Sequence, residues 1–303
     1  MAEPLAYHLV VRAMEGAGGM DAQRRFALAI RHAIDGHLPH WRYRESAKAR
    51  KRDGASVSVV EGAVADWMST DLNPATRVFA ALSKPSNAVW AYNAYNLHGG
   101  LGARTSVDPW ASAGALASSA RREFKIQAED PELCRVGTLS VLERVLRQVA
   151  RNGSRGGQRA PGLLDVGRLL GVEASASFQV AEALALGAAP SLAGLAQALG
   201  SSKRSLQRRL AEESTSVEAL RMSSRLVMAT DALRTDMPME EIAWRCGFSD
   251  LPHMSRALRA SSGMTPGLLR QAMRGGAEPE PARALADASG MPLEDWRERS
   301  TPG

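Results

Sequence analysis

Basic and amide side chains gather on one face of a predicted helix spanning residues 203–213. Leu206 and Leu210 share the opposite face and predict the buried side of this helix. An arginine can donate two hydrogen bonds to a guanine edge, and a glutamine can pair in the same way with adenine. The alternative is a surface helix whose charges only keep the protein in solution. The outward candidates, with the predicted N-cap serine, are Ser202, Lys203, Arg204, Gln207 and Arg208.

A second predicted helix begins near residue 250 and offers fewer groups that could read bases. Asp250 or Ser249 is the expected N-cap, and Met254 and Leu258 form the inward face. The leucine and proline that follow the cap offer little hydrogen bonding. We therefore expect this helix to contact phosphates more than bases. The candidates are Asp250, His253, Ser255, Arg256 and Arg259.

The elements that would position these side chains are two helix-turn-helix units. Ala196 with Gly200, and Ala243 with Gly247, repeat the same spacing. A small residue lets two helices cross closely, and glycine permits the positive φ of the tight turn between them. The alternative is a pair of unrelated helical hairpins.

Residues 216–235 connect the two units and contain neither glycine nor proline, so we expect one uninterrupted helix. At 1.5 Å per residue such a helix is roughly 30 Å long. One turn of B-DNA spans about 34 Å. This similarity predicts two recognition helices in successive major grooves of double-stranded DNA.

These segments resemble the DNA-binding domain of AraC/XylS-type regulators, over roughly residues 172–274. Met254 and Leu258 stand where that family usually has phenylalanine, and they keep the face apolar. The resemblance implies promoter binding and contact with RNA polymerase. It rests on Ser205-Leu206-Gln207-Arg208-Arg209-Leu210, Ile242-Ala243, Cys246-Gly247-Phe248-Ser249-Asp250, His253, Ser255-Arg256-Ala257 and Gly263-Met264-Thr265-Pro266.

The chain of 303 residues is long enough for two domains, and its formal charge of +6 is compatible with a polyanionic partner. Such regulators often carry an N-terminal β-barrel, but this N-terminal half has few alternating strand patterns. We therefore expect a mainly α fold, with a tandem helix-turn-helix domain joined by a long linker helix and a largely helical N-terminal domain of unrecognised type. The expected segments are 1–150 (effector binding, dimerisation or accessory DNA contact), 151–162 (flexible linker), 163–274 (DNA-binding domain) and 275–303 (acidic, disordered tail).

Three stretches of the N-terminal half leave alternatives open. The aromatic and basic run at 41–52 could grip a phosphate backbone, or it could be a solvated helix face. Residues 55–82 fit a further helix-turn-helix or a plain helical hairpin. An apolar stripe at 139–149 fits internal packing or dimerisation.

The sequence offers little for catalysis or metal binding. His32, His37 and His40 lie close together, but no acidic or thiol residue completes a site at ligand spacing. The cysteines, Cys134 and Cys246, cannot form a four-ligand zinc site on their own, and Cys246 lies on an apolar helix face. We therefore expect no enzyme, no cofactor and no metal.

The sequence thus predicts a sequence-specific transcription regulator that binds double-stranded DNA. Without an apolar run long enough to span a membrane or a signal-peptide pattern, we expect it in the cytoplasm. A homodimer formed through the N-terminal domain and a small-molecule effector remain open. The alternatives are a DNA-binding structural or partition protein without effector, and a DNA-targeted enzyme with an N-terminal catalytic domain. The sequence does not separate activator from repressor.

Overall fold

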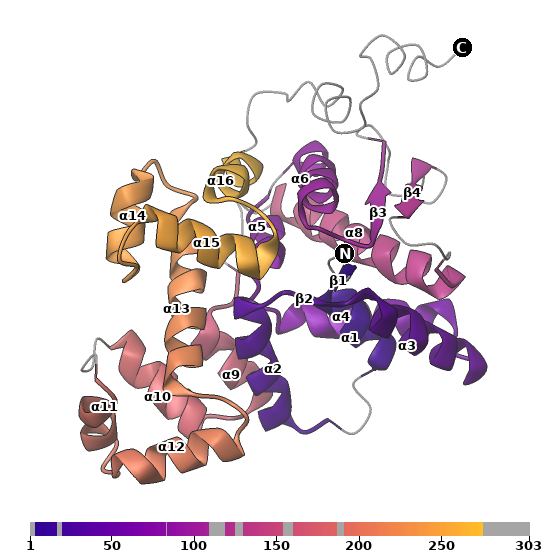
Figure 1. Cartoon of the computed structure of the whole chain (residues 1–303). Coiled ribbons are helices and arrows are strands. Elements are labelled where there is room, and N and C mark those ends of the chain that lie inside the picture. The colour runs from indigo at the N-terminus through magenta and orange to yellow at the C-terminus, as the bar shows by residue number, and fades with distance from the viewer. Residues whose placement is uncertain are drawn as a thin grey trace.

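The computed structural model describes residues 4–16, 20–82, 84–108, 119–124, 130–153, 160–186 and 191–274. Within these ranges the protein is mainly α-helical, as the sequence predicts (Figure 1). The predicted tail at 275–303 and the middle of the predicted linker, residues 154–159, lie outside the described residues.

The N-terminal half is largely helical, which confirms the expectation for this part of the chain. Its two short antiparallel strand pairs, β1 with β2 and β3 with β4, form separate two-stranded sheets. The elements are β1 (Leu5–Tyr7), α1 (His8–Glu15), α2 (Ala22–Ile34), β2 (His37–Pro39), α3 (His40–Arg52), α4 (Val57–Ser69), α5 (Pro74–Ala81), α6 (Pro85–His98), β3 (Ala103–Ser106), β4 (Arg121–Phe124) and α8 (Glu132–Gly153).

The C-terminal part is a succession of helices arranged around one longer helix, α13, which stands upright in Figure 1. The elements are α9 (Leu163–Leu170), α10 (Ala176–Ala185), α11 (Leu192–Ala198), α12 (Lys203–Glu212), α13 (Val217–Ala232), α14 (Met239–Arg245), α15 (Leu251–Ser262) and α16 (Pro266–Arg274).

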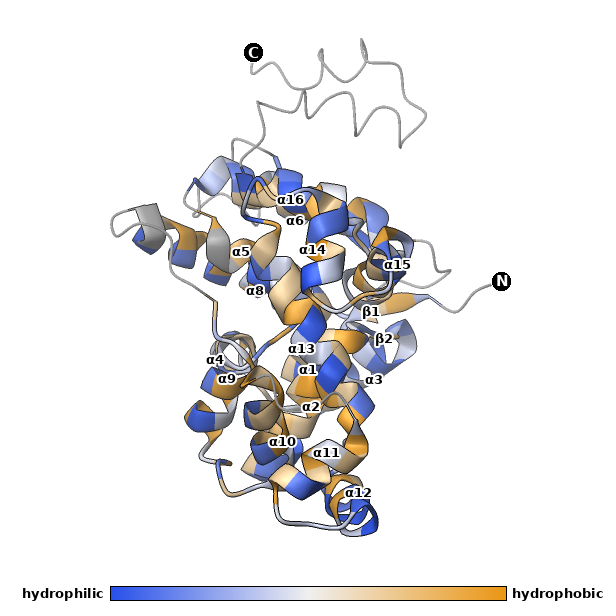
Figure 2. Ribbon diagram, turned by 90° about the vertical axis from the view of Figure 1, so that its left-hand side faces the viewer, coloured by the Kyte–Doolittle hydropathy of each residue, from blue (hydrophilic) through white to orange (hydrophobic). Residues whose placement is uncertain are grey.

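Two hydrophobic clusters hold the fold together, and each draws on both halves of the chain. One joins Leu9 and Leu142 to Leu258 of α15, and the other joins Phe26 of α2 to Leu206 of α12. Figure 2 shows apolar and polar residues alternating around the helices, the pattern of helices that each bury one face. A side chain as buried as Phe26 contributes roughly 1.5–3 kcal/mol relative to an exposed one. The division into the predicted domains 1–150 and 163–274 stays a prediction.

The structure resolves two of the open alternatives. Helix α5 is buried along most of its length between α8 and the helices α13, α15 and α16, so residues 55–82 do not form a further DNA-reading unit. They do not form a packed hairpin either, because α4 packs against α1 and α8 instead of α5. The apolar stripe on α8 packs inside the protein, against α4 and α6. Its four members, Leu139, Leu142, Leu146 and Val149, are all buried.

Hydrogen bonds at the end of α15 fix the two halves relative to each other. The carbonyl oxygen of Ser261 accepts from Asn73 Nδ2 at 2.9 Å and from the backbone N–H of Gly36 at 3.0 Å. The hydroxyl of Ser261 donates to the carbonyl of Ala33 at 2.6 Å. A side chain on Gly36 would place its Cβ 2.3 Å from that Ser261 oxygen, so glycine is required at this approach.

An ion pair between a buried arginine and a partly exposed aspartate ties α5 to α13. Arg77 is 2% exposed, and its Nη2 lies 2.6 and 2.8 Å from the two carboxylate oxygens of Asp231. Its Nη1 donates to the carbonyl of Pro161. Removing Asp231 would leave the buried guanidinium of Arg77 without its charged partner, which is strongly destabilising. The pair therefore fixes where the N-terminal half sits along α13.

Asp71 is the centre of a buried polar network beside this junction. Its Oδ1 lies 3.1 Å from His8 Nε2 and accepts from the N–H of Asn73 at 3.0 Å, while Thr76 Oγ1 donates to its Oδ2 at 2.6 Å. Burial opposes ionisation, but the charge of His8 and these hydrogen bonds outweigh it and lower the pKa of Asp71 to about 2.

This lowered pKa predicts a loss of stability in acid. Because the ionised form is favoured in the folded state, its contribution is present above pH 4 and is lost as the pH falls through 2. A shift of this size corresponds to about 2 kcal/mol. In urea titrations at pH 5 and pH 2, Asp71→Asn should lose less stability between the two pH values than the wild type.

Glu61→Gln, on the exposed face of α4, is the matched control and should keep the wild-type difference. Equal acid sensitivity of the wild type and Asp71→Asn would contradict the role given to Asp71.

Candidate nucleic-acid interface

The first unit consists of α11 and α12, each capped by a serine, and the cap of α12 is the predicted Ser202. Ser191 accepts from the N–H of Gly194, and Ser202 accepts from the N–H of Ser205, both at 3.1 Å. Between the helices Gly200 has φ +60°, the left-handed conformation that the turn requires. Leu206 and Leu210 are buried, which fixes the rotation of α12 about its axis.

The opposite face of α12 is open. Its four exposed candidates are Lys203, Arg204, Gln207 and Arg208. Among the described residues, these four side chains form one ion pair, between Arg208 and Glu212 at 3.7 Å, and both of its side chains are exposed. Such a pair is weak in water and leaves the guanidinium available to another acceptor. The structure thus brings the predicted groups together on one surface, while their contact with DNA stays a prediction.

The second unit consists of α14 and α15. Asp250 is the N-cap of α15, where it accepts from the N–H of His253 at 2.6 Å. This backbone hydrogen bond is the main reason that the pKa of Asp250 is lowered. Gly247 has φ +79° in the turn before α15, as its counterpart does in the first unit. Met254 and Leu258 are buried, as predicted.

The predicted contacts of α15 divide into two groups. Arg256 and Arg259 are exposed, so they are free to meet a phosphate. His253 is half-buried, packs edge-on against Phe248 with ring centroids 5.3 Å apart, and has Ser249 Oγ 3.1 Å from its Nδ1. Ser255 is also half-buried. Asp250 and His253 therefore stabilise the start of α15, whatever else they contact.

Helix α13 separates the two units. It runs without interruption for 16 residues, from Val217 to Ala232, and Ser216 caps it by accepting from the N–H of Ala219. This is shorter than the predicted 216–235 and corresponds to about 24 Å. In both views α12 and α15 lie at opposite ends of α13, and in Figure 2 they lie on the same side of the molecule.

Helix α13 also carries Arg225, a basic side chain that was not among the predicted DNA contacts. A Cβ added at Gly247 would lie 3.2 Å from Arg225 Nε, so this arginine sits beside the turn that leads into α15. Arg221 precedes it by one helical turn, and this basic pair in a helix between two reading units was the available signal.

The basic run and the histidines of the N-terminal half take local partners. In α3, Lys48 pairs with Glu45 at 2.7 Å and Arg50 Nε donates to a backbone carbonyl, which favours a solvated helix face with internal contacts. The three neighbouring histidines point to three different partners: His32 to Arg12, His37 to Tyr95 and His40 to Asp130. Over the described ranges, no group of three potential metal ligands is present.

Comparison with known families identifies the class of the C-terminal part. Residues 195–272 match the family described as a helix-turn-helix domain. Read with the capped helix pairs described above, the match shows a DNA-binding domain of the AraC type, found in transcription regulators. Searches of curated proteins and of solved structures found no match. None of the described helices is long and apolar enough to span a membrane.

The turn of the first unit can be tested through its glycine. Gly200→Val places a β-branched side chain at φ +60°, which should destabilise the protein by about 1–3 kcal/mol in urea titrations. Gly267→Ala is the control, because that exposed glycine lies in α16 with no atom closer than 3.9 Å to an added Cβ. It should be neutral or slightly stabilising. Unchanged stability of Gly200→Val would show that the turn is assigned wrongly.

Proposed function

We propose that this protein is a sequence-specific transcription regulator that binds one operator with both helix-turn-helix units. The observation that carries the proposal is the pair of capped helices, α12 and α15, with exposed basic faces at the two ends of an uninterrupted α13. A recognition helix enters the major groove with its N-terminal part toward the bases. The exposed groups of α12 lie in that part of the helix.

The spacing supports two successive major grooves on one side of the duplex. Helix α13 has 16 residues and is therefore about 24 Å long, and binding in successive grooves requires the two recognition helices to lie roughly 34 Å apart, one DNA turn. A helix packed along its length against α2, α5 and α10 does not bend easily, so the two units act as one rigid reader. Double-stranded RNA is disfavoured because its major groove is too narrow for a helix.

The two helices differ in what they offer to DNA. Helix α12 presents arginine and glutamine side chains, the groups that form paired hydrogen bonds with guanine and adenine. Helix α15 begins with a leucine and a proline and presents Arg256 and Arg259 further along. We therefore assign base reading mainly to α12 and phosphate contact mainly to α15, with Arg225 as an additional phosphate contact.

This assignment predicts different effects for two arginines. Arg208→Ala should weaken binding to the protein's operator sequence by about 1–3 kcal/mol, and it should relax the preference for one base at one position. Arg256→Ala should weaken binding to all DNA sequences by a similar factor. It should also reduce the salt dependence of the DNA affinity by the amount expected for about one phosphate contact. Gel-shift titrations at several salt concentrations measure both.

Arg151→Ala, an exposed arginine of α8, removes the same charge and should leave both affinity and preference unchanged. If Arg208→Ala behaves like this control, α12 does not read bases.

Two-groove binding also predicts a strict spacing between half-sites. An operator lengthened by 5 base pairs between its half-sites presents the second groove on the opposite side of the duplex. Because α13 is rigid, affinity should fall to that of a single half-site. Equal affinity for both operators, measured with the unmodified protein, would refute simultaneous binding by the two units.

Further parts of the proposal concern partners that the family resemblance implies. We propose that the protein contacts RNA polymerase at a promoter, forms a homodimer through its N-terminal half and is regulated by a small molecule. We also propose that it is cytoplasmic and has no catalytic activity. The competing functions are a DNA-binding structural or partition protein and a DNA-targeted enzyme. Genome-wide footprinting distinguishes a regulator from a structural or partition protein, because a regulator protects only a few promoter sites. Intact DNA after incubation with the protein argues against the second.

A further inference from the structure

Two buried histidines of the N-terminal half stack on each other close to the end of α15. The rings of His8, the first residue of α1, and His32 of α2 have centroids 4.3 Å apart and an interplanar angle of 16°. The two residues are 3% and 2% exposed, so bulk water does not solvate them. Two positive rings at this distance would repel each other strongly. The partners of the four ring nitrogens therefore decide where the protons are.

Both nitrogens of His8 face oxygen atoms. Nε2 lies 3.1 Å from Asp71 Oδ1, and Nδ1 lies 3.1 Å from the carbonyl oxygen of Gly36. A carbonyl oxygen can only accept a hydrogen bond, and the same holds for the ionised carboxylate of Asp71. His8 therefore donates from both nitrogens and carries a positive charge while these contacts are in place.

The ring of His32 has the opposite requirement. Arg12 Nε donates to His32 Nε2 at 3.1 Å, and because a guanidinium only donates, this ring nitrogen must be unprotonated. His32 Nδ1 lies 3.3 Å from the carbonyl oxygen of Asp35 and therefore carries the single proton. Burial is the main reason that the pKa of His32 is well below its ordinary value, and the charges of His8 and Arg12 add to this effect.

The charged groups around His32 do not offset a second positive charge in the stack. Asp71 already faces His8, and Glu15 already pairs with Arg12 at 2.7 Å. The other ionisable groups on the neighbouring described elements are Arg31 and Asp35 of α2, Arg42 of α3, which pairs with Glu15, Asp66 of α4, which pairs with Arg25, and His37 of β2.

Each ring of the pair is one contact away from Ser261, near the end of α15. Gly36 accepts from His8 through its carbonyl oxygen and donates its N–H to the carbonyl oxygen of Ser261 at 3.0 Å. Asn73 Nδ2 donates to the carbonyl oxygens of His32 at 2.7 Å and of Ser261 at 2.9 Å. A movement of either ring therefore displaces a group that holds the second recognition helix.

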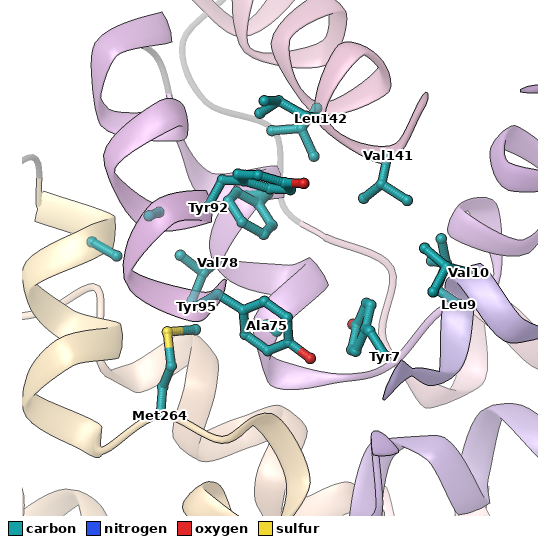
Figure 3. Packing of buried hydrophobic residues seen from close by; sticks show 14 of the residues in the cluster. Tyr7, Leu9, Val10, Ala75, Val78, Tyr92, Tyr95, Val141, Leu142 and Met264 are labelled. Atoms are coloured by element: carbon teal, nitrogen blue, oxygen red, sulfur yellow. The ribbon is translucent and has the colours of Figure 1, made fainter. Parts of the chain in front are cut away.

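The other side of this network is closed by apolar packing. Tyr7 donates to Asp71 Oδ2 at 3.3 Å, and its ring packs edge-on against Tyr95 with centroids 5.1 Å apart. Figure 3 shows both rings in the apolar cluster that also contains Met264, two residues after α15. Burial raises the pKa of both tyrosines, so they stay neutral and leave the histidines as the groups that respond to mild acid.

We propose that the stacked pair is a proton-sensitive lock on the second reader. With His8 charged and His32 neutral, all the contacts above are made and α15 is held against the N-terminal half. A proton taken up from water by His32 Nε2 turns this acceptor into a donor, so Arg12 loses its partner and two charged rings repel each other. Helix α1 then separates from the end of α2, and the junction at Ser261 opens. The effect on DNA rests on the proposed function, whereas the lock itself does not.

The lock should open in mild acid. A solvated histidine has a pKa of about 6.5, so the open form takes up the proton below that pH, whereas the closed form does so only at a lower pH. The closed form is therefore fully favoured above about pH 6.5 and becomes less stable relative to the open form as the pH falls. Between pH 7.5 and 5.5 one such histidine makes opening about tenfold more favourable. Release of His37, whose pKa burial also lowers, adds to this factor.

The protonation states are tested by NMR of the ring nitrogens of the histidines in the full chain at pH 6.5. His8 should carry a proton on both nitrogens, and His32 should carry one proton, on Nδ1. The variants His8→Gln and His32→Gln assign the signals. Two neutral rings, or a proton on Nε2 of His32, would overturn the proposal.

The lock is tested by hydrogen exchange of the wild type without DNA, corrected for the intrinsic exchange rate. The amide of Gly36 should lose protection at least about tenfold between pH 7.5 and 5.5. It should also be less protected than the amide of Leu142, which is buried within α8, because the junction opens without unfolding of the whole protein. An unchanged Gly36, or equal protection of both amides at each pH, contradicts a local lock.

His32→Gln keeps an acceptor for Arg12 and does not titrate, so its loss of protection at Gly36 should be about tenfold smaller than that of the wild type. His98→Gln is the matched control, because this histidine is exposed at the end of α6, and it should behave like the wild type. Equal pH dependence of His32→Gln and the wild type would overturn the lock. If His32→Gln does not fold, the measurements on wild-type Gly36 still decide.

Gel shifts of operator DNA at pH 7.5 and 5.5 test the link to DNA binding. Between these pH values the wild type should lose affinity threefold or more relative to His32→Gln. An equal change in both proteins, with the exchange result as expected, would overturn the link and leave the lock in place. Failure to bind any DNA would refute the proposed function and would not affect the NMR and exchange results.

Discussion

The carbonyl oxygen of Ser261, at the end of α15, is the point on which the arrangement of the two readers depends. Gly36 and Asn73 both donate to it from the N-terminal half, and Ser261 returns a hydrogen bond to Ala33. The ion pair between Arg77 and Asp231 adds a second fixed point on α13. Because buried polar groups without partners are costly, these contacts allow one relative position of the two halves.

A DNA-binding unit held in this way differs from one carried on a tether. The apolar side of α13 is covered partly by α2 and α5, so the N-terminal half completes both hydrophobic clusters. The outward faces of α12 and α15 remain open. The N-terminal half therefore supports the proposed DNA-binding surface from behind, and a structural change within it is transmitted through packed helices.

The sequence was most informative where the structure is local. Capping by Ser202 and Asp250 and the burial of Leu206 and Met254 follow from residue type and helical period, and the structure confirms them. Contacts between distant segments left no periodic signal, so the Asp71 network, the Ser261 junction and the stacking of His8 on His32 were not predicted. The end of α13 was placed too late because the residues after Ala232 continue in a turn that no glycine or proline marks. The position of Arg225 beside Gly247 likewise depends on how two units pack.

The composition of the second hydrophobic cluster also bears on how the chain folds during synthesis. Phe26 and Ile30 of α2 leave the ribosome early, but partners such as Leu195 and Leu220 are made much later. At 5–20 residues per second, the delay between Phe26 and Leu220 is roughly 10–40 s. During that time the apolar face of α2 is covered only in part, by early residues such as Leu72. Nascent chains of this protein are therefore natural clients for chaperones that bind short apolar stretches.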